Sequence, residues 1–299
     1  MKQQRHYFLL FIFVIFSLVS TAQEVKEPPV RDSSWIKNYE PFRIAGNLYY
    51  VGTYDLSSYL ITTNAGNILI NTGLASSAVQ IKNNIEQLGF KFNDTKIILT
   101  TQAHYDHMGA MAAIQKQTGA KFYVSKGDAV TAASGGAADY EMGKYGATYQ
   151  PLKAAKKLKD GSIVKLGTTA LKVLSHPGHT MGSCSYLLTV NDSGKSYKVL
   201  IANMPSIITD RRFEEITAYP AISKDYAKTL QVMKNIDFDL WVASHASQFE
   251  LHKKHQPGDP YNPGIFNDKK AYIEYLNEFQ KAYDDKIKKD VAERDEKAK

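Results

Sequence analysis

Cysteine is almost absent from this sequence, whose 299 residues contain Cys184 as the single thiol. One thiol cannot form an intramolecular disulfide, so the fold has to be stable from its own hydrophobic core. The composition allows this, because 43% of the residues are hydrophobic and 22% are charged, as in ordinary globular proteins. Cys184 lies in the segment "SCSYLLTV", and we expect it to be a small buried residue in a strand.

Long apolar runs are also lacking, with one exception close to the N-terminus. The run "YFLLFIFVIFSLV" covers thirteen residues, which is too short to span a bilayer comfortably. Lys2 and Arg5 precede the run, and Ser20 and Ala22 follow it with the small side chains that a signal peptidase recognises. We therefore predict a signal peptide at 1–22 and an exported, periplasmic chain at 23–299 with no membrane association. A retained anchor is the alternative.

A dense cluster of one charge sign is missing as well. The formal net charge is +7, from 37 basic and 30 acidic residues, and two of these positive charges lie in the predicted signal peptide. The basic residues are scattered, and the densest run, from Lys286 onward, alternates with acids. This pattern is typical of a solvated helix face and argues against nucleic acid as a partner. A mildly basic chain favours anionic small molecules, and we expect a monomer.

Strand and helix patterns alternate along the chain. Amphipathic helices are predicted at 76–89, 109–119 and 225–233, and Tyr-, Val- and Ile-rich strands lie between them. A segment rich in Gly, Ala and Tyr, 134–149, is predicted to be a long loop near the functional site. The chain ends in a long helix with one apolar face, made of Tyr272, Leu276, Phe279, Tyr283 and Ile287. This order predicts a single domain with helices outside a pair of sheets.

Histidine recurs where predicted strands end. The three segments are "IILTTQAHYDH", "LKVLSHPGH" and "LWVASH", which carry His104 with Asp106 and His107, His176 with His179, and His245. Neutral imidazole and carboxylate are good zinc ligands, and sheets hold the roots of strand-end residues rigidly. A loop histidine with a local hydrogen bond is the alternative for each segment alone. Three such segments together favour a metal site. His176 precedes a proline and is expected to have a supporting role, and His252 and His255 lie among lysines and are expected at the surface.

The segments "QAHYDH", "HPGHTMGS" and "WVASH", in this order and spacing, resemble the metallo-β-lactamase superfamily. The further segments "EPFRIAGNLYYVGTYDL", "ILINTG", "VLIANMPS", "DFDLWVASHASQF" and "GDPYNP" resemble its subclass B3, and more narrowly the glutamine-bearing GOB-type branch. The resemblance covers nearly all of the predicted mature chain. It implies an α/β fold, the αββα sandwich, in a single domain.

The resemblance also implies two zinc positions. One would be held by Gln102, His104 and His179, and the other by Asp106, His107 and His245. Gln102 stands where the subclass usually has histidine, and an amide oxygen is a weaker donor than imidazole. We therefore expect the position of Asp106, His107 and His245 to bind zinc more tightly.

Three residues depart from patterns in the wider superfamily. Asn71 stands where many members have an aspartate that orients a ligand histidine, and asparagine can still form hydrogen bonds there. Asn203 and Met204 stand where thioesterase-type relatives and many lactonases have a metal-bridging aspartate, which favours the β-lactamase branch. Met204 cannot hold a zinc-bound water as a serine might. Ser183, among small polar residues after His179, lets other groups approach.

The implied function is a zinc-dependent β-lactamase that opens the cyclic amide of penicillins, cephalosporins and carbapenems and so gives antibiotic resistance. By the same resemblance, a zinc-bound hydroxide would attack the carbonyl, and Asp106 would ligate metal and orient the nucleophile or pass its proton. Ser206 matches a position that contacts the substrate carboxylate. Tyr140 or Tyr145 could stack on substrate side chains, with packing inside their loop as the alternative.

Two other functions are compatible with the same residues. One is a hydrolase of the same fold that acts on lactones or thioesters. The other is a non-catalytic zinc-binding protein of the periplasm.

Overall fold

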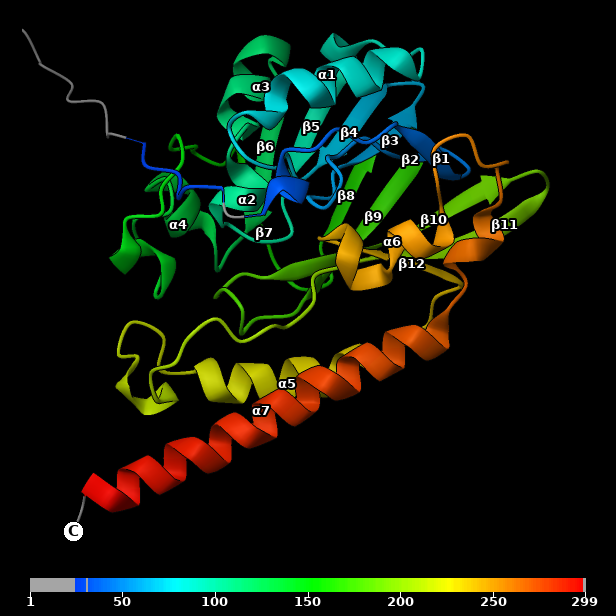
Figure 1. Cartoon of the computed structure of the whole chain (residues 1–299). Coiled ribbons are helices and arrows are strands. Elements are labelled where there is room, and N and C mark those ends of the chain that lie inside the picture. Colours follow the sequence, from blue (N-terminus) through cyan, green and yellow to red (C-terminus); the bar gives the residue numbers. More distant parts are fainter. Residues whose placement is uncertain (1–24, 31, 298–299) are drawn as a thin grey trace, which may run out of the picture.

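The computed structural model describes residues 25–30 and 32–297, so the predicted signal peptide lies outside the described residues. Two sheets lie face to face, and helices cover the outer face of each (Figure 1). This is the predicted αββα sandwich. Within the described part of the chain, no helix combines the length and the apolar character that crossing a membrane requires.

The first sheet has seven strands in sequence order. β1 to β4 form an antiparallel meander, and β4 to β7 run parallel. The strands are β1 (Phe42–Ala45), β2 (Leu48–Tyr50), β3 (Tyr59–Thr63), β4 (Gly66–Ile70), β5 (Thr95–Leu99), β6 (Lys121–Ser125) and β7 (Lys156–Leu158). The helices of this half are α1 (Ser77–Gln87), α2 (Tyr105–Met108), α3 (Met111–Thr118) and α4 (Ala129–Ala133). Because β4, β5 and β6 are parallel, their carboxyl ends meet at one edge of the sheet.

The second sheet has five strands in the order β12-β11-β10-β9-β8. The strands are β8 (Ile163–Leu166), β9 (Thr169–Ser175), β10 (Cys184–Asp192), β11 (Lys195–Ala202) and β12 (Leu240–Ala243). Two helices, α5 (Ile222–Met233) and α7 (Lys269–Lys297), pack together on its outer side, and the short α6 (Leu251–Lys254) follows β12 (Figure 1). The chain returns from β11 to a parallel β12 through α5.

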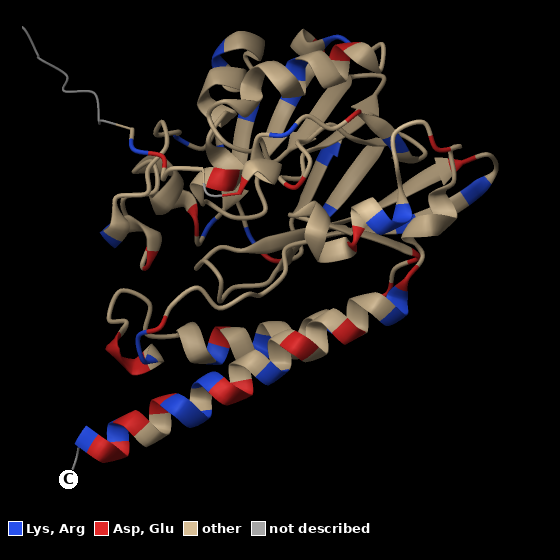
Figure 2. Ribbon diagram, in the orientation of Figure 1, with Lys and Arg blue, Asp and Glu red and all other residues tan. Residues whose placement is uncertain are grey.

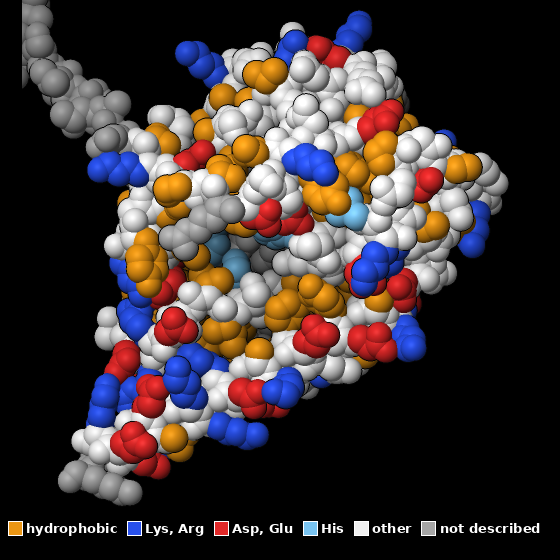
Figure 3. Space-filling view, in the orientation of Figure 1, with side chains coloured by type: hydrophobic (Ala, Val, Ile, Leu, Met, Phe, Trp, Pro, Cys, Tyr) orange, Lys and Arg blue, Asp and Glu red, His pale blue; other side chains and the backbone are white. Residues whose placement is uncertain are grey.

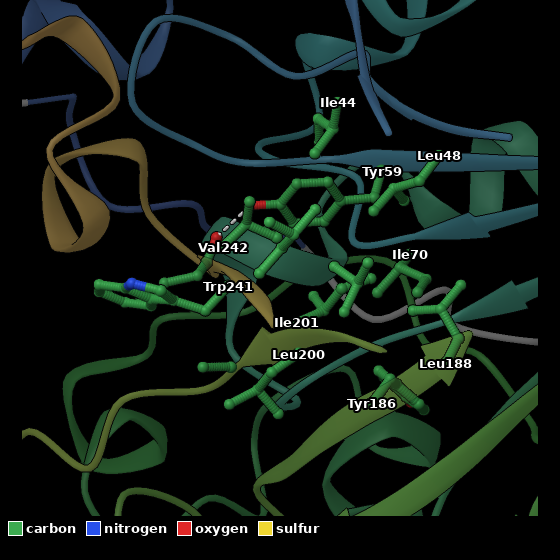
Figure 4. Close-up of a cluster of buried hydrophobic side chains, with 14 of the residues drawn as sticks. Ile44, Leu48, Tyr59, Ile70, Tyr186, Leu188, Leu200, Ile201, Trp241 and Val242 are labelled. Carbon is green, nitrogen blue, oxygen red and sulfur yellow. Dashed lines mark hydrogen bonds between the residues drawn. The ribbon is translucent and has the colours of Figure 1, made fainter. Parts of the chain in front are cut away.

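The main core lies between the sheets, where the apolar faces of both are buried (Figure 4). The Tyr59 hydroxyl donates a hydrogen bond of 2.5 Å to the carbonyl of Ala243, which joins β3 to the end of β12. A second apolar cluster lies between the first sheet and α1 and α3. The end of β12, which leads to His245, is therefore held in place by a hydrogen bond from the core residue Tyr59.

Most sequence expectations agree with these elements, and some need correction. Cys184 is buried in β10 as expected. The helix expected at 225–233 begins earlier, at Ile222, and the loop expected at 134–149 contains a 3₁₀ helix, Met142–Tyr145. The expectation that His255 lies at the surface is wrong, because His255 is buried against Tyr39 and stacks on Phe42. Flanking lysines misled the sequence argument, because only Lys253 is exposed, whereas the Lys254 side chain is itself 12% exposed and packs over the Trp241 ring.

Candidate metal centre

The three histidine segments meet at one edge of the sandwich. His104 follows β5, His179 follows β9, and His245 lies two residues after β12. All three side chains line one pocket of about 180 Å³. Figure 3 shows histidine side chains at the bottom of a hollow between the two layers.

One group of possible ligands is centred on the Asp106 carboxylate. Asp106 Oδ2 lies 3.3 Å from His107 Nε2 and 3.3 Å from His245 Nε2. The ligand atoms of the three residues all lie within 4.8 Å of one another. Burial raises the pKa of Asp106, but the imidazoles of His107 and His245 outweigh it and hold that pKa well below its usual range. Asp106 is thus an ionised carboxylate, the form that binds a metal.

A second carboxylate fixes the orientation of His245. Asp55 Oδ2 lies 3.1 Å from His245 Nδ1, and Asp55 Oδ1 accepts a hydrogen bond of 2.9 Å from the Ser247 amide. Burial raises the pKa of Asp55, but these contacts prevail and lower it to about 2. With Nδ1 held by Asp55, the Nε2 atom of His245 faces Asp106 and the pocket.

The other group consists of Gln102, His104 and His179. The rings of His104 and His179 lie 4.9 Å apart. His179 Nδ1 lies 2.8 Å from the carbonyl oxygen of Ser206, and His104 Nε2 lies 3.2 Å from Asp139 Oδ2. These contacts leave Nε2 of His179 and Nδ1 of His104 available to a metal.

Unpartnered polar atoms show that the residues fit a metal. Gln102 Oε1 and both ring nitrogens of His107 are buried without a hydrogen-bond partner in the described structure, although Asp106 lies close to His107. Buried polar atoms are normally satisfied, so these unpartnered atoms require an explanation. Four imidazoles, a carboxylate and an amide oxygen form the kind of nitrogen and oxygen donor set that zinc takes.

Asn71 joins the strand ends that carry these residues. Its backbone is left-handed, with φ of 60°, a conformation that asparagine tolerates. Asn71 Oδ1 accepts a hydrogen bond of 2.9 Å from the Thr101 amide, and the Thr101 hydroxyl lies 2.9 Å from that of Ser244. Asn71 therefore orients the backbone before Gln102, and it uses the hydrogen-bonding capacity that the sequence predicted for it.

Asp128 joins the first and second histidine segments. Its carboxylate accepts hydrogen bonds from the Ala103 amide (2.8 Å), the Thr180 hydroxyl (2.9 Å) and the Gly182 amide (2.8 Å). Ser183 completes the turn, because its hydroxyl accepts a hydrogen bond of 3.0 Å from the Thr180 amide. The position of His179 thus depends on a side chain at the start of α4.

His176 and Met204 both lie close to the pocket residue Asn203. His176 is buried, with Nδ1 2.7 Å from the Ser185 hydroxyl, and this hydroxyl also accepts a hydrogen bond from the Asn203 amide. Burial lowers the pKa of His176 to about 4, so the ring is neutral at pH 7. Met204 is buried and lines the pocket beside Asn203.

The residues suggested as substrate contacts have different environments. Ser206 lines the pocket, with its hydroxyl 3.0 Å from His179 Nδ1. Tyr140 is buried, its hydroxyl donates to the carbonyl of His179 at 3.2 Å, and its ring packs against Tyr219, so it belongs to a buried cluster and does not line the pocket. Tyr145 is 70% exposed and lines an adjoining pocket of about 400 Å³ with Trp35.

Sequence reasoning missed several pocket residues. Trp35 packs against Tyr105 and His245, with ring centroids 6.3 Å and 5.8 Å apart, and Met142, Ile208 and Gln248 also line the pocket. The carboxylates Asp55, Asp128 and Asp139 were missed too. Each is an isolated aspartate in the sequence, and the one available indication was that Asp139 lies in the loop predicted to flank the site.

Comparison with known proteins agrees with this geometry. Residues 52–191 match the family model described as the metallo-beta-lactamase superfamily. The metallo-beta-lactamase GOB-18 from Elizabethkingia meningoseptica is 58% identical, has a TM-score of 0.89, and matches over 90% of this chain and 100% of its own. The class B3 di-zinc metallo-beta-lactamase LRA-12 from an Alaskan soil metagenome is 59% identical over 87% of this chain and 99% of its own, with a TM-score of 0.86. A beta-lactamase from Chitinophaga pinensis is 53% identical over 86% and 97%, with a TM-score of 0.84. On this sequence identity and coverage, the chain belongs to the metallo-β-lactamase superfamily, among the enzymes of subclass B3.

Proposed function

We propose that the protein is a zinc-dependent β-lactamase that hydrolyses the cyclic amide of penicillins, cephalosporins and carbapenems and so gives resistance to them. The observation that carries this proposal is the gathering of one complete donor set at a single pocket. Five donors line this pocket, namely Gln102, His104, Asp106, His179 and His245, and the sixth, His107, lies with its Nε2 atom 3.3 Å from Asp106 Oδ2. The similar proteins described as β-lactamases and as a di-zinc enzyme support it.

Some residues of the pocket would bind metal, and others would bind substrate. Gln102, His104 and His179 would hold one zinc, and Asp106, His107 and His245 the other. Bound zinc lowers the pKa of water, which supplies a nucleophile near neutral pH, and it stabilises developing negative charge. Asp106 is ionised and lies between two imidazoles, so it can orient a nucleophile or accept its proton. The Ser206 hydroxyl would bind the substrate carboxylate.

Hydrolysis of a chromogenic cephalosporin tests the reaction. We expect turnover by the purified protein, loss of turnover with a chelator, and recovery when zinc is added back. Steady-state rates with one penicillin, one cephalosporin and one carbapenem then define the range. Turnover of a lactone or thioester with inert β-lactams would identify a different hydrolase, and bound zinc without any turnover would identify a binding protein.

We also propose that the two metal positions are unequal. Gln102 offers a neutral amide oxygen, whereas the other position has the ionised Asp106 and two imidazoles held within 4.8 Å of it. At limiting zinc, the position of Asp106, His107 and His245 is expected to fill first and to support turnover. Metal counting on His107→Ala and Gln102→Ala tests this. One bound zinc and nearly full activity in His107→Ala would contradict the proposal.

We also propose that the protein is exported to the periplasm. Cleavage after Ala22 would leave a periplasmic monomer, 23–299, without a membrane anchor. Mass spectrometry of the protein from the periplasmic fraction is expected to give Gln23 as the first residue, and light scattering to give the mass of one chain. A mass that includes 1–22 would indicate a retained anchor.

A further inference from the structure

A carboxylate outside the donor set connects one proposed metal ligand to the wall of the pocket. Asp139 lies in the loop between α4 and β7, 35 residues after His104. Its Oδ2 atom lies 3.2 Å from His104 Nε2, and both side chains are buried, at 3% and 4% exposed. The contact is therefore shielded from water and is not a surface ion pair.

The second oxygen of Asp139 organises the loop. Oδ1 accepts hydrogen bonds from the amides of Glu141 (2.9 Å) and Met142 (2.7 Å), at the start of the 3₁₀ helix Met142–Tyr145. Met142 lines both the metal pocket and the adjoining pocket that contains Tyr145. One carboxylate thus holds a histidine ring with one oxygen and a segment of the pocket wall with the other.

We propose that Asp139 is a positioning residue that links metal binding at His104 to the order of the wall around Met142. An acceptor at Nε2 keeps the proton on that nitrogen and leaves the lone pair of Nδ1 for a metal. A metal on Nδ1 in turn fixes the ring and strengthens the Nε2 contact with Asp139. Because such coupling is reciprocal, zinc binding orders the Met142 segment, and the ordered segment favours zinc binding.

The nearly isosteric change Asp139→Asn separates this role from simple packing. Asparagine has one acceptor oxygen, whereas Asp139 uses two. If that oxygen faces the two amides, the NH₂ group faces His104 Nε2, which favours the tautomer with the proton on Nδ1 and blocks metal binding. If it faces His104, the amides of Glu141 and Met142 lose their acceptor. The substitution cannot satisfy both groups at once.

Zinc titration against a chromophoric chelator tests whether Asp139 affects zinc affinity. This inference rests on the proposed metal positions, and two bound zincs in the wild-type protein verify that both positions exist, independently of Asp139. We expect Asp139→Asn to weaken one zinc by about ten- to a hundredfold and to leave the other at wild-type affinity. Asp55→Asn is the matched control, because Asp55 holds His245, and it is expected to weaken the other zinc.

Hydrogen exchange of the Glu141 and Met142 amides tests whether zinc binding orders this segment. The wild-type protein is measured first. Adding zinc to the metal-depleted protein is expected to slow exchange of the Glu141 and Met142 amides by about tenfold. In Asp139→Asn this zinc-dependent protection is expected to disappear, whereas in Asp55→Asn it persists. The proposal is overturned if zinc leaves these amides unchanged in the wild-type protein, or if Asp139→Asn keeps both zincs at wild-type affinity.

Discussion

Gln102 has a buried amide oxygen without a hydrogen-bond partner in the described structure, and it lines the same pocket as the imidazoles of His104 and His179. At the scale of single residues, this side chain distinguishes the two proposed metal positions, because the other position holds an ionised carboxylate. The residues that orient the ligands matter as much as the ligands. Asp55, Asp139 and the Ser206 carbonyl each hold one ring nitrogen of a histidine, so that the other nitrogen faces the pocket.

Replacement of Gln102 by histidine is expected to tighten the weaker metal position. Imidazole is the stronger donor, and the gain should be at least about tenfold in zinc affinity, or about 1.4 kcal/mol. Competition with a chelator measures it, and the affinity of the position at Asp106 serves as the internal reference. Equal affinity of the weaker position before and after the change would contradict the argument.

His176 is expected to make the fold sensitive to acid. Its pKa falls from the ordinary 6.5 to about 4 on burial, so the folded protein disfavours the charged ring. The stability contributed by the neutral ring is complete above pH 6.5 and is lost as the pH falls toward 4. By pH 5 the loss is about 2 kcal/mol in the free energy of unfolding. Urea unfolding of metal-depleted wild type and His176→Gln at pH 7 and pH 5 measures it, and parallel losses in both proteins would contradict it.

At the scale of elements, the turn between β9 and β10 carries His179 and is held by packing against α4. Gly182 makes this possible, because a β-carbon there would lie 2.1 Å from Ser125 Oγ and 2.2 Å from the Asp128 amide nitrogen. The carboxylate of Asp128 then bonds to both the turn and Ala103. Two loops from different sheets thus keep a fixed separation, which a pair of ligands on separate elements requires.

The substitution Gly182→Ala is expected to disturb one metal position more than the fold. The added methyl group forces the turn away from α4, at a cost of about 1–3 kcal/mol. It should weaken the zinc held by His179 and spare the zinc at Asp106. Gly264→Ala is a suitable control, because the single contact near its added β-carbon is a side-chain atom at 3.0 Å. Unchanged zinc binding in Gly182→Ala would count against the role of the turn.

At the scale of the whole molecule, the pocket lies at one edge of the sandwich, and stability is supplied elsewhere. The C-terminal helix α7 packs on α5 and β12, with Tyr272 and Leu276 fully buried and the Tyr272 hydroxyl bonded to the Met233 carbonyl. Its distal half carries alternating acidic and basic side chains (Figure 2). Exposed pairs such as Lys281 with Asp285 contribute little to stability, so the proximal apolar contacts dominate.

Truncation of Leu276 to alanine is expected to reduce stability without changing catalysis. A fully buried leucine costs about 2–5 kcal/mol when truncated, and this site lies outside the pocket lining. Thermal unfolding should show the loss, while kcat and zinc content stay at wild-type values. Lys289→Ala, on the exposed side of the same helix, should change stability by less than about 0.5 kcal/mol. A fall in kcat with Leu276→Ala would show that α7 also shapes the pocket.

The alternation of strand and helix patterns predicted the layered fold, because hydrophobic periodicity is a local property that each segment carries in its own residues. Histidines at three strand ends likewise indicated a shared metal site, and motif resemblance supplied the ligand set, Gln102 included. The inward turn of His255 did not follow from its sequence, because neighbouring lysines say nothing about which side of a short helix faces the core.

The sequence by itself determined the order of the elements and the residues that offer donor atoms. The tertiary structure alone decided how those atoms are oriented, because the orienting groups come from distant segments. Asp55 lies 190 residues from His245, and Asp128 lies 52 residues from Thr180. An isolated aspartate carries no pattern that marks it as the partner of a particular histidine. That pairing exists only where the two sheets bring their strand ends to one edge.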